Sequence, residues 1–326
     1  MRKFWNKVDI GDNIHSMVKG ENGLYLGMRN ETGEGSMTCY DIFPGAVFMY
    51  CDYHMEFCES RFKSKGDLLC IDYCIEGSFE NEIKKDVFTY QKEKELNINT
   101  RKYHSGKFIF PQRHFHGITI CFSIPEADQS LSEIFQGINV SITELKQKFC
   151  SKSEICIIKA TEELQHFFMS IVSIPELHRI EYMRIKVAEL LLQLKTLRIE
   201  DCFIDVPYIH KTELQKIKAV REKMVENISR FYTIEELSGM FGISQTALKN
   251  EFKILYGKPI YAYMKQYRMN LAAAILLEQP QQKIAQVAAV VGYDNASKFS
   301  AAFSKVMGMT PIQYRRKEKS YQLNGL

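Results

Sequence analysis

Two histidines, His114 and His116, are the residues best placed to bind a metal ion or a small ligand. Alternate residues of a strand point to the same face, so the two imidazoles would act together. A metal site on such a strand needs a carboxylate nearby, but no glutamate follows until Glu126. His54 and His104 could complete a site. We expect hydrogen-bonded or surface histidines, no metal and no cofactor, and we retain His114 and His116 as candidate effector contacts.

The nine cysteines are a second potential source of chemistry. Their number is odd, the chain is large and no export signal is visible, which favours reduced thiols over disulfides. Cys70 and Cys74 lie on the same face of an alternating run with Leu68 and Asp72. This pattern favours small, partly buried side chains over a redox or metal site.

A third set of polar residues has the composition of a DNA-reading surface. Leu248 and Phe252 are spaced as the buried stripe of a helix, which leaves the polar side of that helix in solvent. Amide, hydroxyl and ammonium groups suit hydrogen bonds to base edges and contacts to phosphates. The predicted base readers are Gln245, Thr246, Lys249 and Asn250, and the predicted phosphate contacts are Ser244 and Lys253.

The same unit occurs twice, at an offset of about 50 residues. Residues 237–259 align with residues 287–311, and each copy predicts a short helix, a glycine turn and a second helix. This is the helix-turn-helix arrangement. The corresponding region of the second copy contains Asn295, Ser297, Lys298 and Lys305.

A long helix is expected between the two copies, because Pro259 suits a helix start and Pro280 a helix end. Roughly 20 residues of helix span about 30 Å. Successive major-groove segments on one side of B-DNA lie about 34 Å apart. One chain could therefore place both second helices in neighbouring grooves.

The charge distribution also separates this part from the rest of the chain. Of the 326 residues, those from 207 onward include 18 Lys and Arg against 9 Asp and Glu, a net charge of +9. The whole chain carries +4, so the first 206 residues carry −5. A basic third joined to a mildly acidic remainder suggests a nucleic-acid-binding module. No membrane span or signal peptide is visible, and we expect a cytoplasmic protein.

The predicted fold class is α+β with two domains. Residues 1–125 show short alternating strands broken by turns, typical of an antiparallel β sandwich or barrel; residues 126–206 show helical periodicity and a linker; residues 207–326 form an all-α domain. A helix from about Glu176 to Leu197 carries an apolar stripe that packs either on its own domain or on a second subunit. The residues assigned to the dimer seam in the second alternative are Met183, Val187, Leu190, Leu191 and Leu194.

The C-terminal residues resemble the DNA-binding domain of the AraC/XylS family of transcription regulators from Ile217 to Arg316. The matching positions include Ser244, Leu248, Phe252, Lys253, Gly257, Arg268, Gly292, Tyr293, Phe299, Phe303, Gly308, Thr310, Pro311 and Arg315. The resemblance implies two recognition helices in consecutive major grooves. It also implies that in the second unit Ser297 and Lys298 read bases and that Asn295 and Lys305 contact phosphates. Ala296 and Ala301 stand at reader positions of the second unit, so we expect the first unit to carry more of the sequence discrimination. Ser304 stands where the family often has lysine.

The N-terminal pattern resembles the cupin-like sensing domain of such regulators, which implies effector binding, dimerisation or both. We therefore predict a sequence-specific DNA-binding transcription regulator that is not an enzyme. Its expected partners are double-stranded DNA, a second copy of the chain, a small-molecule effector and, for an activator, RNA polymerase. The alternatives are a cupin-type metal-dependent enzyme with a nucleic-acid-binding tail, and a regulator controlled by a protein partner.

Overall fold

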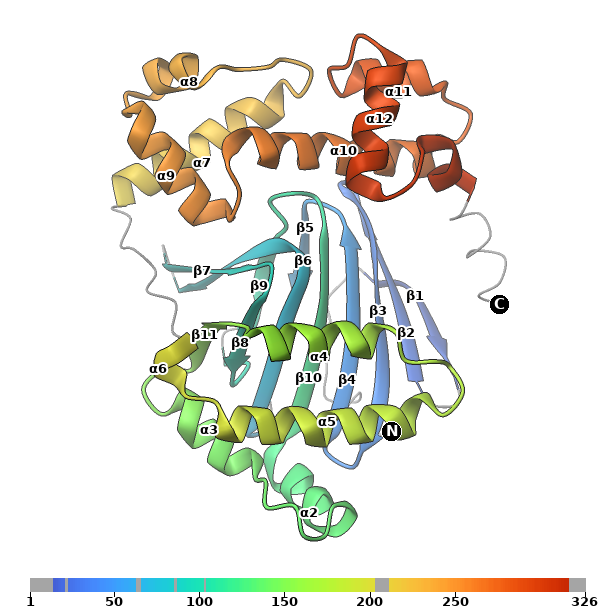
Figure 1. Ribbon diagram of the computed structural model, residues 1–326, viewed down its shortest axis with the longest axis vertical. Helices are drawn as coiled ribbons and strands as arrows, with labels where there is room; N and C mark the ends of the chain where they lie inside the picture. The colour runs from blue at the N-terminus through green and yellow to red at the C-terminus, as the bar shows by residue number, and fades with distance from the viewer. Residues whose placement is uncertain are drawn as a thin grey trace. The chain divides into compact units, whose positions relative to one another are not determined.

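The structure, a computed structural model, describes residues 14–20, 23–62, 66–84, 87–102, 104–202 and 211–316. The chain divides into two compact units, Met1–Asp205 and Val206–Leu326. The first unit contains the described strands, and the second is helical (Figure 1). The expected α+β fold class is confirmed. None of the helices in the described ranges has the length and apolar character needed to cross a membrane.

The main sheet of the first unit is antiparallel and curves into a half-barrel (Figure 1). Its strands, in spatial order, are β1 Ile14–Lys19, β2 Gly23–Asn30, β3 Gly33–Phe43, β4 Ala46–His54, β10 Phe115–Ser123, β6 Leu68–Lys84, β8 Glu95–Asn99 and β11 Ile155–Lys159. The second half of the long strand β6 leaves this order. It pairs with β7 Val87–Lys92 and β9 Gly106–Ile109, and β9 pairs with β5 Phe57–Ser60.

Both faces of this sheet are apolar, because successive residues of its strands are buried in two different hydrophobic clusters, one on each face. In β4, Phe48 and Tyr50 point to a core shared with the helices, whereas Met49 and Cys51 point to the inside of the half-barrel. We call these the helix-side face and the inner face. The inner face holds six of the cysteines among its buried residues, and none of the described cysteines is in a disulfide. The expectation of reduced thiols in a partly buried setting agrees with this placement.

Helices of the first unit cover the helix-side face: α2 Ile124–Ile134, α3 Ile142–Cys150, α4 Glu162–Val172, α5 Arg179–Thr196 and α6 Ile199–Cys202. The ring of Tyr73 stacks on that of Phe168 of α4 with centroids 4.1 Å apart. One expectation was wrong, because residues 155–159 were assigned to a helical region but form β11. The β-branched side chains of this short run favour an extended strand that pairs with β8.

The apolar stripe of α5 packs within its own domain. Met183, Val187, Leu190, Leu191 and Leu194 all belong to the helix-side core, with relative exposures of 0% or 1%. A side chain without exposed surface cannot contact a second subunit. The assignment of these residues to a dimer seam was therefore wrong, and the alternative of packing on the parent domain is correct.

The second unit contains α7 Lys211–Glu226, α8 Ile234–Phe241, α9 Gln245–Tyr256, α10 Ile260–Glu278, α11 Ile284–Val290 and α12 Ala296–Met307. Figure 1 shows α8 and α9 at one end of α10 and α11 and α12 at the other. At 19 residues, α10 is about 28 Å long. It packs against both helical pairs and acts as the predicted spacer.

Candidate nucleic-acid interface and ligand cavity

The first helix-turn-helix has well-defined helix ends. Thr233 and Glu236 form a capping box: the Thr233 hydroxyl accepts from the Glu236 N–H at 3.1 Å, and the Glu236 carboxylate accepts from the Thr233 N–H at 2.7 Å. Gly242 ends α8 in a left-handed conformation with φ of 56°. Ser244 then caps α9 by accepting a hydrogen bond from the Ala247 N–H at 3.2 Å. The sharp turn fixes the direction in which α9 leaves α8.

The outward side of α9 carries the predicted base readers. Leu248 and Phe252 have no exposed surface and hold the helix on its core. On the opposite side, Gln245, Thr246, Lys249, Asn250 and Lys253 are all exposed. The structure thus places these side chains on one solvent-facing surface, as the periodicity predicted. Their contacts with bases and phosphates stay predictions.

The second helix-turn-helix, formed by α11 and α12, repeats this construction with different exposed side chains. The Asn295 side chain caps α12 by accepting from the Ser297 N–H at 2.8 Å and the Lys298 N–H at 3.1 Å. Phe299 and Phe303 are fully buried. The exposed side of α12 contains Ser297, Lys298, Ala301 and Lys305. Ser244 and Asn295 therefore act as helix caps here, and their roles as phosphate contacts stay predictions.

A buried arginine of the spacer α10 holds the segment that precedes α8. Arg268 of α10 is 5% exposed; its Nε donates to the Ile228 carbonyl and its Nη2 to the Arg230 carbonyl, each at 2.9 Å. Its guanidinium also lies 3.6 Å from the ring centre of Phe231. Burial lowers the pKa of Arg268. These bonds fix the segment between α7 and α8 to the spacer, a role that its spacing in the sequence does not predict.

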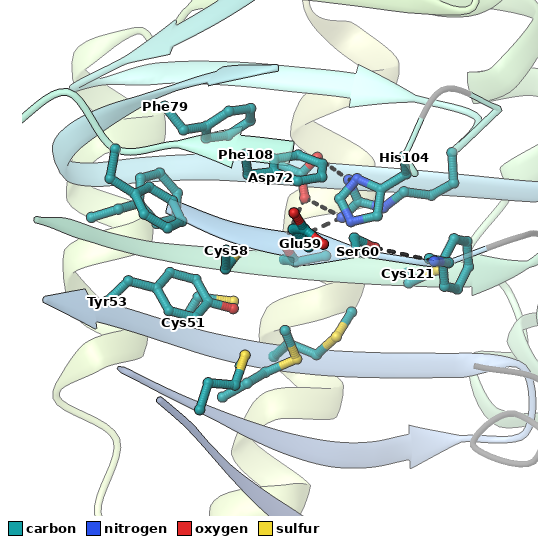
Figure 2. A pocket seen from close by; sticks show the side chains of 18 residues that line it. Cys51, Tyr53, Cys58, Glu59, Ser60, Asp72, Phe79, His104, Phe108 and Cys121 are labelled. Atoms are coloured by element: carbon teal, nitrogen blue, oxygen red, sulfur yellow. Dashed lines mark hydrogen bonds and ion pairs between the residues drawn. The ribbon is translucent and has the colours of Figure 1, made fainter. Parts of the chain in front are cut away.

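A cavity of about 130 Å³ lies inside the half-barrel of the first unit. Its lining combines methionines, thiols and aromatic rings with one polar cluster: Met28, Met37, Met49, Cys51, Tyr53, Cys58, Glu59, Ser60, Phe62, Asp72, Phe79, Arg101, His104, Phe108, Phe110, Phe115, Thr119 and Cys121. Figure 2 shows Asp72 and His104 near each other, with Tyr53 and Phe79 further along the lining. Apolar pockets with a few convergent polar groups are the usual form of small-molecule sites.

Asp72 and Arg101 form the polar cluster of this cavity. Arg101 donates to both carboxylate oxygens of Asp72, at 2.6 Å and 2.9 Å. The same carboxylate accepts from the Thr119 hydroxyl at 2.6 Å and from the Asn99 amide at 2.8 Å. Burial alone would lower the pKa of Arg101, but the charge of Asp72 outweighs burial and raises it. The two buried charges cancel, and Asp72 has little capacity left for a ligand.

The remaining cavity wall is uncharged apart from the exposed Glu59. Burial raises the pKa of the Cys51 and Cys58 thiols to about 12, so both are protonated at neutral pH. Desolvation, assisted by the charge of Arg101, lowers the pKa of His104 well below its usual value. Its Nδ1 lies 3.2 Å from Arg101 Nη1, which can only donate. The His104 Nε2 therefore carries the ring proton and can donate it to a ligand.

The effector candidates suggested by the sequence do not line this cavity. Phe115 of β10 lines it, and His116, the next residue, points to the helix-side face. Adjacent strand residues face opposite sides, and His114 does not line the cavity either. A role of His114 and His116 as effector contacts stays a prediction. Sequence reasoning missed Arg101 and His104 as a pair. Their positions depend on the turn after β8, which no motif marks.

Comparisons with known proteins match the second unit most clearly. A family described as "Helix-turn-helix domain" matches residues 237–317. The chain is 26% identical over 132 residues to the HTH-type transcriptional activator RhaR of Enterobacter sp., covering 40% of this chain and 45% of RhaR. It is 34% identical over 88 residues to a putative AraC-like transcription regulator of Streptomyces lividans, covering 27% and 29%. The chain thus spans less than half the length of these relatives.

One similar solved structure extends over both units. Fatty-acid-bound ToxT from Vibrio cholerae is 15% identical, with a TM-score of 0.32, over 86% of this chain and 97% of ToxT. The fold and the repeated motif together define a double helix-turn-helix protein with an N-terminal β domain. The similarity to AraC-like transcription regulators lies in the helix-turn-helix part of the chain, and residues 237–317 form a helix-turn-helix domain.

Proposed function

We propose that the chain is a sequence-specific transcription regulator that places α9 and α12 in successive major grooves of its operator. The supporting observation is that both helices expose their predicted DNA-contacting side chains from the two ends of one spacer, α10. The spacer length of about 28 Å is comparable to the groove repeat of about 34 Å. The net charge of +9 over residues 207–326 favours approach to DNA.

In-vitro selection from random double-stranded DNA with the full-length chain tests this function. We expect enrichment of a sequence with two conserved blocks about one helical turn apart. A single block, or enrichment of no sequence, contradicts simultaneous use of both helices. The variant Gln245→Ala/Lys249→Ala provides a control, because it should weaken the first block and leave the second in place.

The cavity of the first unit suits a small, neutral effector with an apolar body and one hydrogen-bond acceptor. Its buried charges cancel, its thiols are protonated and the His104 Nε2–H is available to donate. An apolar cavity of about 150 Å³ binds benzene. A volume of about 130 Å³ therefore favours a small ring or short chain as the enclosed part of the ligand.

A thermal-shift panel of small neutral aromatic and aliphatic compounds tests the effector site. A true ligand raises the unfolding temperature because it binds only the folded protein. We expect the shift to shrink in His104→Phe and to persist in His166→Phe, a matched change on the exposed side of α4. No shift across the panel contradicts effector binding in the cavity and favours control by a protein partner.

Homodimerisation and contact with RNA polymerase stay predictions. The five α5 residues first assigned to the dimer contact are buried, so a dimer must use other residues. Sedimentation of the full chain, alone and with its selected DNA, measures the number of subunits. One chain per bipartite site is the minimum that the two recognition helices require.

A further inference from the structure

Two imidazole rings meet on the helix-side face, where β4 ends and β10 begins. Phe115 pairs with Tyr53 in the register of these strands, so His114 comes opposite His54. The ring centroids are 5.0 Å apart, and the two Nδ1 atoms face each other at 3.4 Å. The sequence spacing suggested that His114 acts with His116. The fold instead pairs it with a histidine 60 residues earlier.

A carboxylate holds the outer nitrogen of each ring. His54 Nε2 lies 3.1 Å from Asp52 Oδ1, and His114 Nε2 lies 3.1 Å from Glu76 Oε2. An ionised carboxylate only accepts, so each Nε2 carries a proton and each Nδ1 of a neutral ring presents a lone pair. Two lone pairs at this separation repel each other unless a cation or a shared proton lies between them. Rings oriented by carboxylates in this way are typical of metal-binding histidines.

Local backbone features fix this arrangement. The register of β10 with β6 shifts between His116 and Gly117, where Cys74 and Glu76 become the successive partners. One extra residue reverses the alternation of side chains, which turns Glu76 away from the inner face and toward His114. On the other side, Arg113 forms an ion pair with Glu56 at 2.6 Å and holds the turn that carries His114.

The spacing of the two Nδ1 atoms matches a metal ion. Zinc binds histidine nitrogen at about 2.0–2.1 Å, and tetrahedral geometry then places two such nitrogens about 3.3 Å apart. The observed separation is 3.4 Å. One donor atom each of Asp52, His54 and His114 lie within 4.8 Å of one another. The His54 and His114 side chains are 33% and 14% exposed, so an ion can enter from solvent.

We propose that His54 and His114 bind a divalent transition-metal ion of the Zn²⁺ type through their Nδ1 atoms. Asp52 and Glu76 orient the rings from the outer nitrogens, and water completes the coordination. Imidazole nitrogen as the protein ligand suits Zn²⁺, Co²⁺ and Ni²⁺ better than Mg²⁺ or Ca²⁺. This proposal departs from the sequence-based expectation of no metal, and it does not depend on the DNA-binding function.

Metal binding is tested on the full-length chain without an affinity tag, after removal of metal by chelation. Equilibrium dialysis against Zn²⁺, followed by elemental analysis, should show one saturable site per chain. His54→Ala and His114→Ala should each weaken binding by at least about 10- to 100-fold. His166→Ala removes an exposed histidine of α4 and should bind Zn²⁺ as the wild type does.

Two further measurements keep the test decisive. Glu76 is 63% exposed, so Glu76→Gln should fold normally while it weakens Zn²⁺ binding about 10-fold or more. Co²⁺ in the site should show ligand-field absorption without a thiolate charge-transfer band, which excludes the cysteines as ligands. The absence of a saturable Zn²⁺ site, or affinity unchanged in Glu76→Gln and in every folded histidine variant, overturns the proposal and leaves a proton shared between the rings.

Discussion

The two helix-turn-helix units share a frame but differ in their exposed surfaces. In each unit the second helix is capped at its start, carries two buried residues one turn apart, and ends at a glycine with a left-handed backbone, Gly257 after α9 and Gly308 after α12. On the outside, α9 presents long polar side chains, whereas α12 presents two alanines among its predicted reader positions, Ala296 and Ala301. The buried frame maintains the fold, and the exposed residues are the predicted DNA contacts, so we expect the two helix-turn-helix units to carry unequal shares of the recognition.

The turn glycines provide the largest contrast. Gly292 has φ of 84°, and a Cβ there would lie 2.6 Å from the Ser229 carbonyl oxygen; Gly242 has φ of 56° and open space around it. Gly242→Ala should cost about 1–2 kcal/mol for the left-handed backbone alone. Gly292→Ala should cost about 1–3 kcal/mol more, because Ser229 must move. Chemical denaturation of the helical unit measures both, and equal losses would show that the second turn is not tightly packed.

The reading surfaces give the next contrast. Lys249→Ala should weaken binding to the selected site by about 1–3 kcal/mol and relax the preference at one base pair. Lys298→Ala in α12 should change the base preference less, because its neighbours offer fewer donors. Binding titrations against the selected site and single-base variants measure both effects. If Lys249→Ala lowers the affinity for selected and random DNA equally, base reading by this lysine is excluded.

The N-terminal caps of α8 and α11 are expected to differ by about 1 kcal/mol in their contribution to stability. Thr233 accepts a hydrogen bond from the backbone of its own helix, so Thr233→Ala should destabilise the helical unit by about 1 kcal/mol. At the corresponding start of α11, Lys283 has no side-chain acceptor, although its N–H donates to Gln286 at 3.0 Å. Lys283→Thr should therefore stabilise the unit by a few tenths to about 1 kcal/mol. Thermal unfolding of the two variants checks the opposite signs.

The smallest effect concerns phosphate contacts. Lys253 and Ser304 occupy equivalent positions of α9 and α12, because each directly follows a buried phenylalanine, Phe252 or Phe303. Lys253→Ala should lower the slope of log affinity against log salt by about one, and Ser304→Lys should raise it by about one. Affinities on selected and random DNA should change alike. A sequence-selective change in either variant contradicts a phosphate role.

The sequence predicted the helical unit more completely than the β unit. Repeated glycines, caps and buried aromatics such as Phe252 and Phe303 are local signals, and the structure places them as expected. The cavity residues Asp72 and Arg101 come from β6 and the turn after β8, and only strand pairing brings them together. His54 and His114 meet for the same reason. Long-range register, which local patterns do not encode, was the missing information.

The α5 stripe illustrates a different limit. Its spacing predicted an apolar surface correctly, but an apolar stripe has the same pattern whether it faces its own sheet or a second subunit. Only the packing against the sheet, which leaves Met183 and Leu190 without exposed surface, decides between the two. A pattern in sequence identifies a buried surface without identifying what covers it.

Central to the proposed function is the reading of two successive major grooves by one chain, through α9 and α12. Hydroxyl-radical footprinting of the full-length chain on its selected site, combined with guanine methylation interference, tests it most directly. We expect two protected segments on one face of the duplex, about one helical turn apart, with stronger base interference in the segment that Gln245→Ala/Lys249→Ala weakens. One protected segment, or two on opposite faces, would contradict this mode of binding.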